Sequence, residues 1–488
     1  MTVEQNPKRY LSLYERYSVS RRNIGFPSVI FFIVSYPTSS SLPSDAFLED
    51  RIRKLQERLP LLNAEIRDYN TSKPYFAVRD EIRDPRDILF QTKYEPESSR
   101  QSEMEDIFIK EPLRLITKED FYSGPSWQVR KHVHRSQNPA QAESSRAYLT
   151  LSIDHAFSDG QGSLSILRYL LAGDDETCQS IPHEPLERVT RYEDTINIKP
   201  SMRYLLPIIF DKLLVPKLPS FLQYYLRSAP TWPSSMIKNK SAEALPRQLL
   251  LFLPTELIDS LKYTAKQNGV KTLHGVLKAA LLTSIWAIYG PTLIPFKVKG
   301  ATPRSDRNSM ELGHPICTGN YVSFPKIEIT LEGKDNFWNV AKQCSDKLSA
   351  PETVRQGRMD IGTLAYIPEP EKEKTNPQFP TGWESFLSDQ INSDSPFGDA
   401  LNLSNLGKVD LPPRADDMVW GQRASPFAGA ITCNVMSHKA GFRMIITWLE
   451  DSAVKEDEVL RLEKVFVGML QRLIEAQEDT TLEALSRT

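Results

Sequence analysis

The sequence predicts a two-domain protein of the α/β (α+β) class. Its 488 residues exceed the roughly 250 to 300 residues that a single hydrophobic core usually serves. In both halves, apolar segments with the period of strands are interspersed with apolar segments that have the period of helices. We place the boundary in the turn-rich segment 230–245, which gives an N-terminal domain at 1–235 and a C-terminal domain at 236–488.

The first half contains three segments typical of buried strands and one typical of a helix. PSVIFFIVSY, SWQVRKHVH and AYLTLSI are rich in β-branched and aromatic residues. Ser44 is an N-cap candidate for a helix that runs through Leu59, and Pro60 marks its end. The polar, turn-rich stretches at 83–107 and 135–146 indicate loops.

The second half opens with a strand in RQLLLFLP and continues with a helix from Leu273 to Tyr289, whose apolar residues recur with a helical period. Thr272 is its predicted cap, and Gly290 its predicted stop. The segment 367–399 is rich in proline and charge, so we expect a mobile surface insertion. GFRMIITWL predicts a further strand, and an amphipathic helix closes the chain.

The apolar stretch at 203–228 is interrupted by prolines. Packing against the core beneath a crossover is the ordinary interpretation. Peripheral contact with a lipid surface, or the lining of a substrate channel, stays open as an alternative.

Composition and charge exclude several classes of protein. The 60 Lys and Arg residues nearly cancel the 62 Asp and Glu residues, and no basic stripe with interleaved aromatics occurs, so nucleic acid is not an expected partner. The four cysteines form no CxxC pair and predict neither a disulfide framework nor a zinc site. The sequence shows no export signal and no apolar run long enough to span a bilayer, so a cytoplasmic protein is expected.

One segment carries candidate chemistry. In AYLTLSIDHAFSDGQGS, strand alternation places His155 on the same face as Leu149, Leu151 and Ile153, so the imidazole leaves the strand on its apolar side. The glycines that follow form a tight turn before a helix. An imidazole in this position suits a ligand site. From spacing alone, a hydrogen-bonded core histidine followed by a plain Asp159-Gly160 turn remains the competing interpretation.

The segment HAFSDG matches the HxxxDG signature of the acyltransferase superfamily that contains chloramphenicol acetyltransferase, plant acyl-CoA-dependent acyltransferases and peptide-synthetase condensation domains. The sequence most resembles fungal alcohol acetyltransferases. The resemblance extends over most of the chain, through RYLSLYERYSVSRRNIGF, LPLLNAEI, GPSWQVR and TLHGVLKAALLTSIW to TPRSDR, GNYVSFP and LNLSNLG. A PxxxR and an SNxG thus follow the HxxxDG in the expected order.

The resemblance implies two similar sheet-and-helix domains that form a pseudo-dimer, with a solvent tunnel at their interface and His155 inside it. It implies transfer of an acyl group, most simply acetyl, from acyl-CoA to the hydroxyl of a small alcohol or natural product. His155 would act as general base. Transfer would be direct, with acyl-CoA as co-substrate, no bound cofactor and no metal. No histidine in the sequence has a metal-ligand spacing such as HExxH.

The same resemblance implies supporting roles for three residues. Asp159 would pair with an arginine of the second domain and hold the loop that aims His155; Arg307 fits the PxxxR spacing, with Arg304 as the alternative. Gly160 would leave room for the acyl carbonyl, unless it is only a turn glycine. The chain departs from the family where Asp154 replaces a frequent second histidine.

Three other functions stay open at this stage. The acyl donor could be bound to a carrier protein, as for a condensation or release enzyme. The acceptor could be an amine, because the same base serves an N-acyltransferase. A degenerate member could act as a scaffold, although such a protein has no need of His155, Asp159 and Gly160 together.

Overall fold

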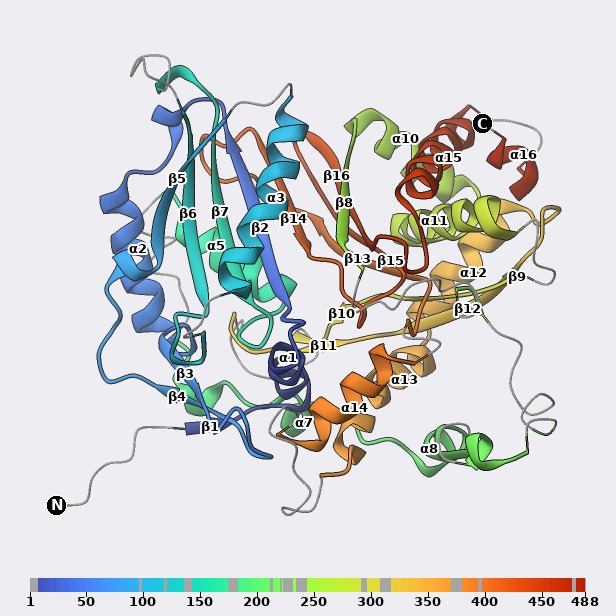
Figure 1. Ribbon diagram of the computed structural model, residues 1–488. Coiled ribbons are helices and arrows are strands. Elements are labelled where there is room, and N and C mark those ends of the chain that lie inside the picture. Colours follow the sequence, from blue (N-terminus) through green and yellow to red (C-terminus); the bar gives the residue numbers. More distant parts are fainter. Residues whose placement is uncertain are drawn as a thin grey trace.

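The computed structural model describes residues 8–95, 99–117, 121–135, 143–173, 183–210, 214–219, 222, 231–233, 244–290, 296–307, 317–369, 380–393, 397–475 and 480–487. Two sheets of mixed direction lie side by side and are each covered by helices (Figure 1). The predicted mixed α/β class with two sheet-and-helix lobes is therefore confirmed. We call them the five-stranded lobe and the six-stranded lobe.

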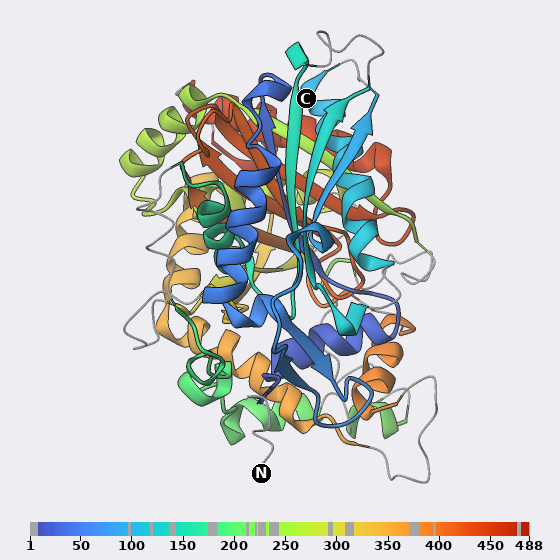
Figure 2. The same ribbon diagram turned by 90° about the vertical axis from the view of Figure 1, so that its left-hand side faces the viewer.

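The five-stranded sheet has the order β14-β2-β7-β6-β5, and its strands are β14 (Asp417–Gln422), β2 (Val29–Tyr36), β7 (Ala147–Asp154), β6 (Trp127–His134) and β5 (Leu89–Tyr94). Helix α2 (Asp45–Arg58) packs with α5 (Gly160–Leu171) on one face, and α3 (Arg100–Ile116) covers the other. Figure 2 shows α2 in front of the sheet. The alternation predicted for β7 is confirmed, because Leu149, Leu151 and Ile153 join the α2 core whereas Tyr148 joins the α3 core.

The six-stranded sheet has the order β12-β9-β13-β15-β16-β8, and its strands are β12 (Lys326–Leu331), β9 (Phe296–Ala301), β13 (Leu401–Lys408), β15 (Ile431–His438), β16 (Gly441–Leu449) and β8 (Pro246–Leu253). Its largest core is shared with α10 (Thr255–Gln267), α11 (Leu273–Tyr289), α12 (Phe337–Ser349), α15 (Glu456–Ile474) and α16 (Leu482–Ser486). The Thr272 side chain caps α11 by accepting a hydrogen bond from the Gly275 N–H.

Smaller elements complete the described structure. They are the three-stranded sheet β1 (Lys8–Tyr10), β4 (Tyr75–Val78) and β3 (Ala64–Arg67), the hairpin β10 (Arg304–Ser305) with β11 (Val322–Ser323), and helices α1 (Leu13–Asn23), α7 (Tyr192–Thr195), α8 (Met202–Ile209), α13 (Pro351–Thr363) and α14 (Gly382–Ile391). None of the helices described here is both long and apolar enough to cross a membrane.

The second half of the chain contributes one strand to the five-stranded sheet. β14 comes late in the chain, yet it pairs with β2 in antiparallel register, with Trp420 opposite Phe32. In Figure 1 this orange strand lies beside the blue and cyan strands of the five-stranded lobe. β14 also contacts β15 of the other sheet, so this strand lies between the two sheets and contacts both. The division at 230–245 stays a prediction.

Two predicted irregular regions contain regular structure. The loop expected at 83–107 is wrong, because β5 and the start of α3 lie there. Ser99 caps α3, and Met104, Ile107 and Phe108 on its inner face are buried. The helix is amphipathic, and its polar outer face explains why the sequence predicts a loop. In the insertion expected at 367–399, α14 packs on α1. Of the loop expected at 135–146, residues 136–142 lie outside the described part of the chain.

The apolar segment at 203–228 does not pack into the core along its described helix. Leu205 of α8 is buried, whereas Met202, Leu206 and Ile209 are exposed. The core interpretation is therefore wrong for the outer face of α8. Most of the remaining segment lies outside the described residues.

Candidate active site

His155 lies directly after β7, at the junction of the two lobes. Its backbone N–H donates to the Ser28 carbonyl, at 2.9 Å, which fixes the chain beside β2. The side chain is 7% exposed and lines a cavity of about 120 Å³. That cavity is also lined by Gly160 from α5, Trp420 from β14 and Asn434 from β15. Residues from both sheets thus enclose the imidazole.

Asn320 holds the imidazole from the opposite lobe. Its Nδ2 lies 2.9 Å from Nδ1 of His155 and 3.0 Å from the carbonyl oxygen of the same residue. The edge of the Tyr14 ring packs against the imidazole, with ring centroids 5.9 Å apart. Among the described residues, Nε2 of His155 has no hydrogen-bond partner. Nε2 is therefore the ring nitrogen left for a ligand.

Burial keeps the imidazole neutral. Desolvation lowers the pKa of His155 below its ordinary value of 6.5, and the nearby Arg21 guanidinium lowers it further. The Asp159 carboxylate and a hydrogen bond to the residue's own backbone act in the opposite direction but do not outweigh burial. A histidine in this state carries a lone pair at neutral pH.

Asp159 connects the turn after β7 to Arg307 and to the loop 317–321. It is the N-cap of α5, and its Oδ1 accepts from the N–H groups of Gln161 and Gly162 at 3.1 and 3.0 Å. Its Oδ2 accepts from the Tyr321 N–H at 3.0 Å. Arg307 Nη2 lies 2.9 Å from the same oxygen. Burial alone would raise the pKa of Asp159, but Arg307 and the N–H donors hold it below its ordinary value.

Arg307, rather than Arg304, is the arginine beside Asp159. Arg307 also donates to the carbonyls of Thr318 and Gly319, at 3.3 and 2.7 Å. Arg304 is exposed on β10 and lines a separate cavity.

The loop 317–321 is fastened to the segment that follows His155. The Gly319 N–H donates to the Phe157 carbonyl at 2.7 Å, and Ser158 Oγ donates to the Cys317 carbonyl at 2.8 Å. Glu184 accepts from Thr318 Oγ1 at 2.7 Å. The loop leads into the sequence motif GNYVSFP at Gly319, and the contacts of this motif with His155 and Asp159 could not be predicted from spacing.

Two glycines of the turn have different surroundings. A Cβ on Gly160 would meet the Trp420 ring at 3.3 Å and Leu406 at 3.4 Å, on the cavity side. A Cβ on Gly162 would lie 2.1 Å from the Cys317 carbonyl oxygen. Gly162 therefore allows the loop 317–321 to approach the turn, a close contact that the sequence does not predict.

Two further cavities adjoin the His155 cavity. One, of about 250 Å³, shares Tyr14, Phe324 and Phe427 with it. The other, of about 390 Å³, shares Pro303 and Leu406 with it. These two neighbours have no lining residue in common. Among the described residues no group of three or more His, Cys, Asp or Glu side chains could hold a metal ion.

Solved structures with the same architecture are similar over nearly the whole chain. A trichothecene 15-O-acetyltransferase from Fusarium sporotrichioides has a TM-score of 0.63 and 12% identity, covering 96% of this chain and 94% of its own. The first condensation domain of the calcium-dependent antibiotic synthetase, solved with a substrate analogue, has a TM-score of 0.63 and 13% identity, covering 98% of each chain. The condensation domain of the monacolin K polyketide synthase has a TM-score of 0.62 and 8% identity, covering 96% and 98%.

These comparisons establish the fold. The chain has the two-lobed fold of condensation domains and chloramphenicol-acetyltransferase-like acyltransferases, so the resemblance seen in the sequence is confirmed at the level of the fold. No protein-family model and no curated protein matches the sequence. What the chain does must therefore be argued from its own site.

Proposed function

We propose that the protein is an acyltransferase that moves an acyl group from a thioester to a hydroxyl group, with His155 as general base. One observation carries this proposal: the buried His155 imidazole lines a cavity between the lobes, and its Nε2 has no hydrogen-bond partner among the described residues. The fold it shares with a trichothecene 15-O-acetyltransferase and with condensation domains supports the same reaction type.

The reaction needs little beyond a base and a well-placed pair of substrates. Nε2 of His155 takes the proton of the acceptor hydroxyl while the hydroxyl oxygen attacks the thioester carbonyl carbon. The C–O bond forms, the C–S bond breaks, and the departing thiolate takes the proton back from the imidazolium. Since the acyl group arrives already activated, direct transfer in a ternary complex suffices, without an acyl-enzyme.

The proton on His155 must then reside on Nδ1 before the reaction begins. With the Asn320 amide in the orientation described above, its Nδ2 donor would face the Nδ1–H donor at 2.9 Å, so this tautomer requires the amide to be rotated by half a turn. The rotation brings Asn320 Oδ1, which is buried with no partner among the described residues, towards Nδ1 as its acceptor. That arrangement leaves the lone pair on Nε2.

Acyl-CoA is the donor in this proposal, and the acceptor is a small alcohol or a hydroxylated natural product. The two cavities that adjoin His155 without sharing lining residues support separate approaches for donor and acceptor. A carrier-bound acyl group is the second candidate donor, because condensation domains share the fold. An amine acceptor would use the same base.

The test measures thiol release from acetyl-CoA and longer acyl-CoAs with a panel of alcohols and amines. A parallel series replaces CoA with an acylated carrier protein. Acceptor-dependent release of CoA supports the leading proposal, and release only from the carrier favours the second donor. Absence of transfer from both donors to every acceptor class would point to a binding or scaffolding protein.

A further inference from the structure

Two guanidinium groups from different elements line the His155 cavity. Arg21 belongs to the last turn of α1, and Arg423 directly follows β14. Arg21 is 7% exposed, and its Nη2 donates to Ser425 Oγ at 2.7 Å. Its guanidinium also lies 5.0 Å from the centre of the Phe427 ring. The positive charge of Arg21 is thus fixed against the cavity wall.

Neither guanidinium has an anionic partner among the described residues. Other buried arginines of the site are paired, as Arg22 is with Asp154 at 2.6 Å and Arg307 with Asp159 at 2.9 Å. Arg21 has a buried Nε without any partner. Burial, with no carboxylate to offset it, lowers the pKa of Arg423.

No carboxylate among the described cavity-lining residues is left to neutralise Arg21 and Arg423. Asp159 is the one carboxylate among the described residues that line it, and Asp159 is already paired with Arg307. A buried cation without an anion is costly, whereas a charge-assisted hydrogen bond to a carboxylate is among the strongest in proteins. The cavity therefore has the charge of an anion site.

Unpaired neutral groups face the same cavity from the six-stranded sheet. Asn402 lies opposite Thr432 and Ser404 opposite Asn434 in the register of β13 and β15, and all four line the cavity. Asn434 is 1% exposed, and neither its Oδ1 nor its Nδ2 has a partner within the described part of the chain. The same holds for the buried Thr432 Oγ1 and Asn402 Oδ1. Buried polar groups normally have hydrogen-bond partners, so these side chains are suited to bind a polar ligand.

We propose that one of the two co-substrates carries a carboxylate, which Arg21 and Arg423 bind inside the His155 cavity. Asn434 Nδ2 and Thr432 Oγ1 donate to further acceptors of the same molecule, and Asn402 Oδ1 accepts from a donor on it. This inference rests on the proposed function. The carboxylate belongs either to a dicarboxylic acyl group on the donor or to a hydroxy-acid acceptor, and in both cases the bound chemistry is the same.

The experiment compares substrates that differ only in this charge. Succinyl-CoA is compared with butyryl-CoA as donor, and mandelate with methyl mandelate as acceptor. We expect the acid of one pair to have a kcat/KM at least about tenfold higher, mainly through KM, because a charged hydrogen bond contributes roughly 1.5 to 3 kcal/mol. The pair that shows the preference identifies the source of the carboxylate.

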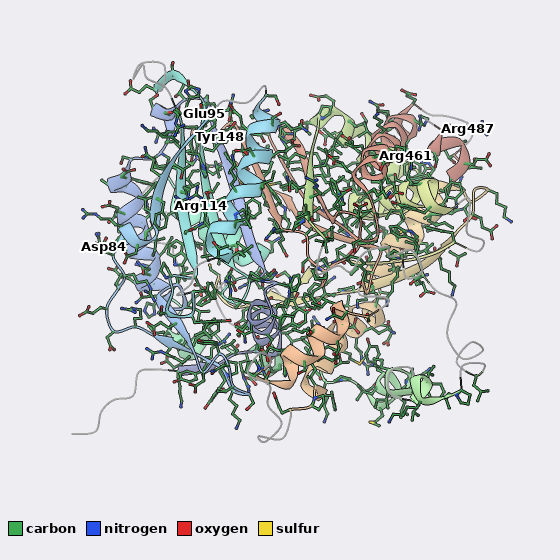
Figure 3. All side chains as sticks on the ribbon, viewed as in Figure 1. Asp84, Glu95, Arg114, Tyr148, Arg461 and Arg487 are labelled. Atoms are coloured by element: carbon green, nitrogen blue, oxygen red, sulfur yellow. The ribbon has the colours of Figure 1, made fainter. Side chains whose placement is uncertain are left out.

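Arginine variants test the assignment. Arg423→Gln removes one guanidinium and Arg21→Gln the other, and each should abolish most of the preference for the acid. Arg21 also packs on Phe427, so Arg21→Gln could lower stability as well as binding. The melting temperature of both variants is therefore measured, and Arg423→Gln provides a second test that does not remove this packing contact. The matched control is Arg487→Gln, since Arg487 is exposed on the outer edge of the six-stranded lobe (Figure 3).

Calorimetric binding of the same four probes to His155→Ala, in which turnover is blocked, separates this inference from the proposed function. Selective binding of an acid that Arg423→Gln weakens supports the site even if no transfer is found. Equal use of acids and neutral analogues by an active wild-type enzyme overturns the inference and leaves the proposed function intact. A preference that persists in both folded arginine variants also overturns it.

Discussion

Asp159 and Arg307 form a buried ion pair that joins the two lobes, with Arg307 Nη2 2.9 Å from Asp159 Oδ2. The carboxylate also caps α5 and accepts from the Tyr321 N–H. The pair thus positions the turn after His155.

Breaking this pair should destabilise the protein and slow turnover together. Arg307→Met leaves a buried carboxylate uncompensated, and such losses are typically roughly 3 to 5 kcal/mol in the free energy of unfolding. Urea denaturation measures the effect. Arg304→Met is the matched control and should change stability by less than about 0.5 kcal/mol, as expected for an exposed side chain. Equal effects of the two substitutions on stability would contradict the stabilising role of the Arg307–Asp159 pair.

The two glycines of the turn should respond differently to alanine. Gly162→Ala places a methyl group 2.1 Å from the Cys317 carbonyl oxygen, so we expect a lower melting temperature and little activity. Gly160→Ala meets only side chains at 3.3 Å and beyond, on the cavity side. It should fold normally and lose activity because the cavity is narrowed. A normally folded, fully active Gly162→Ala protein would contradict the described contact.

The pH profile of kcat/KM should have an acidic limb below the ordinary histidine range. Since burial lowers the pKa of His155 below 6.5, the imidazole is already neutral at pH 7 and gains no further lone pair at pH 8. Activity should therefore be level across that interval and fall only as the pH decreases through the lowered pKa. An acidic limb above pH 6.5 would mean that His155 is not the titrating base or is more exposed than described.

Asn320 is expected to act as a positioning residue through His155. Asn320→Ala should reduce kcat by about tenfold while leaving the protein folded, since it removes roughly one hydrogen bond to the imidazole. Asn320→Asp places a negative charge beside the ring and should move the acidic limb to higher pH. Identical pH profiles for wild type and Asn320→Asp would show that this contact does not influence the base.

The sequence predicted best those elements whose boundaries are local. Pro27 before β2, Ser44 before α2 and Thr272 before α11 each act within a few residues, and all three elements are found where expected. The position of β14 in the five-stranded sheet could not be foreseen, because its pairing with β2 spans nearly 400 residues of chain. The helix α3 was missed because polar residues dominate its exposed face.

The same distinction applies to the candidate site. His155, Asp159 and Gly160 lie in one short motif, and Arg307 follows from the PxxxR spacing. By contrast, Asn320 and Gly162 acquire their importance only when the loop 317–321 contacts the turn after β7. Arg21 carries no sequence signal of its own, because an arginine at a helix end is ordinarily exposed.

The most direct test of the central claim compares acceptor-dependent thiol release by wild type and by His155→Ala. Equal melting temperatures of the two proteins show that the variant is folded. The account predicts that release falls by roughly 10² or more in the variant, as expected for loss of a general base. Release at the wild-type rate from folded His155→Ala would contradict it.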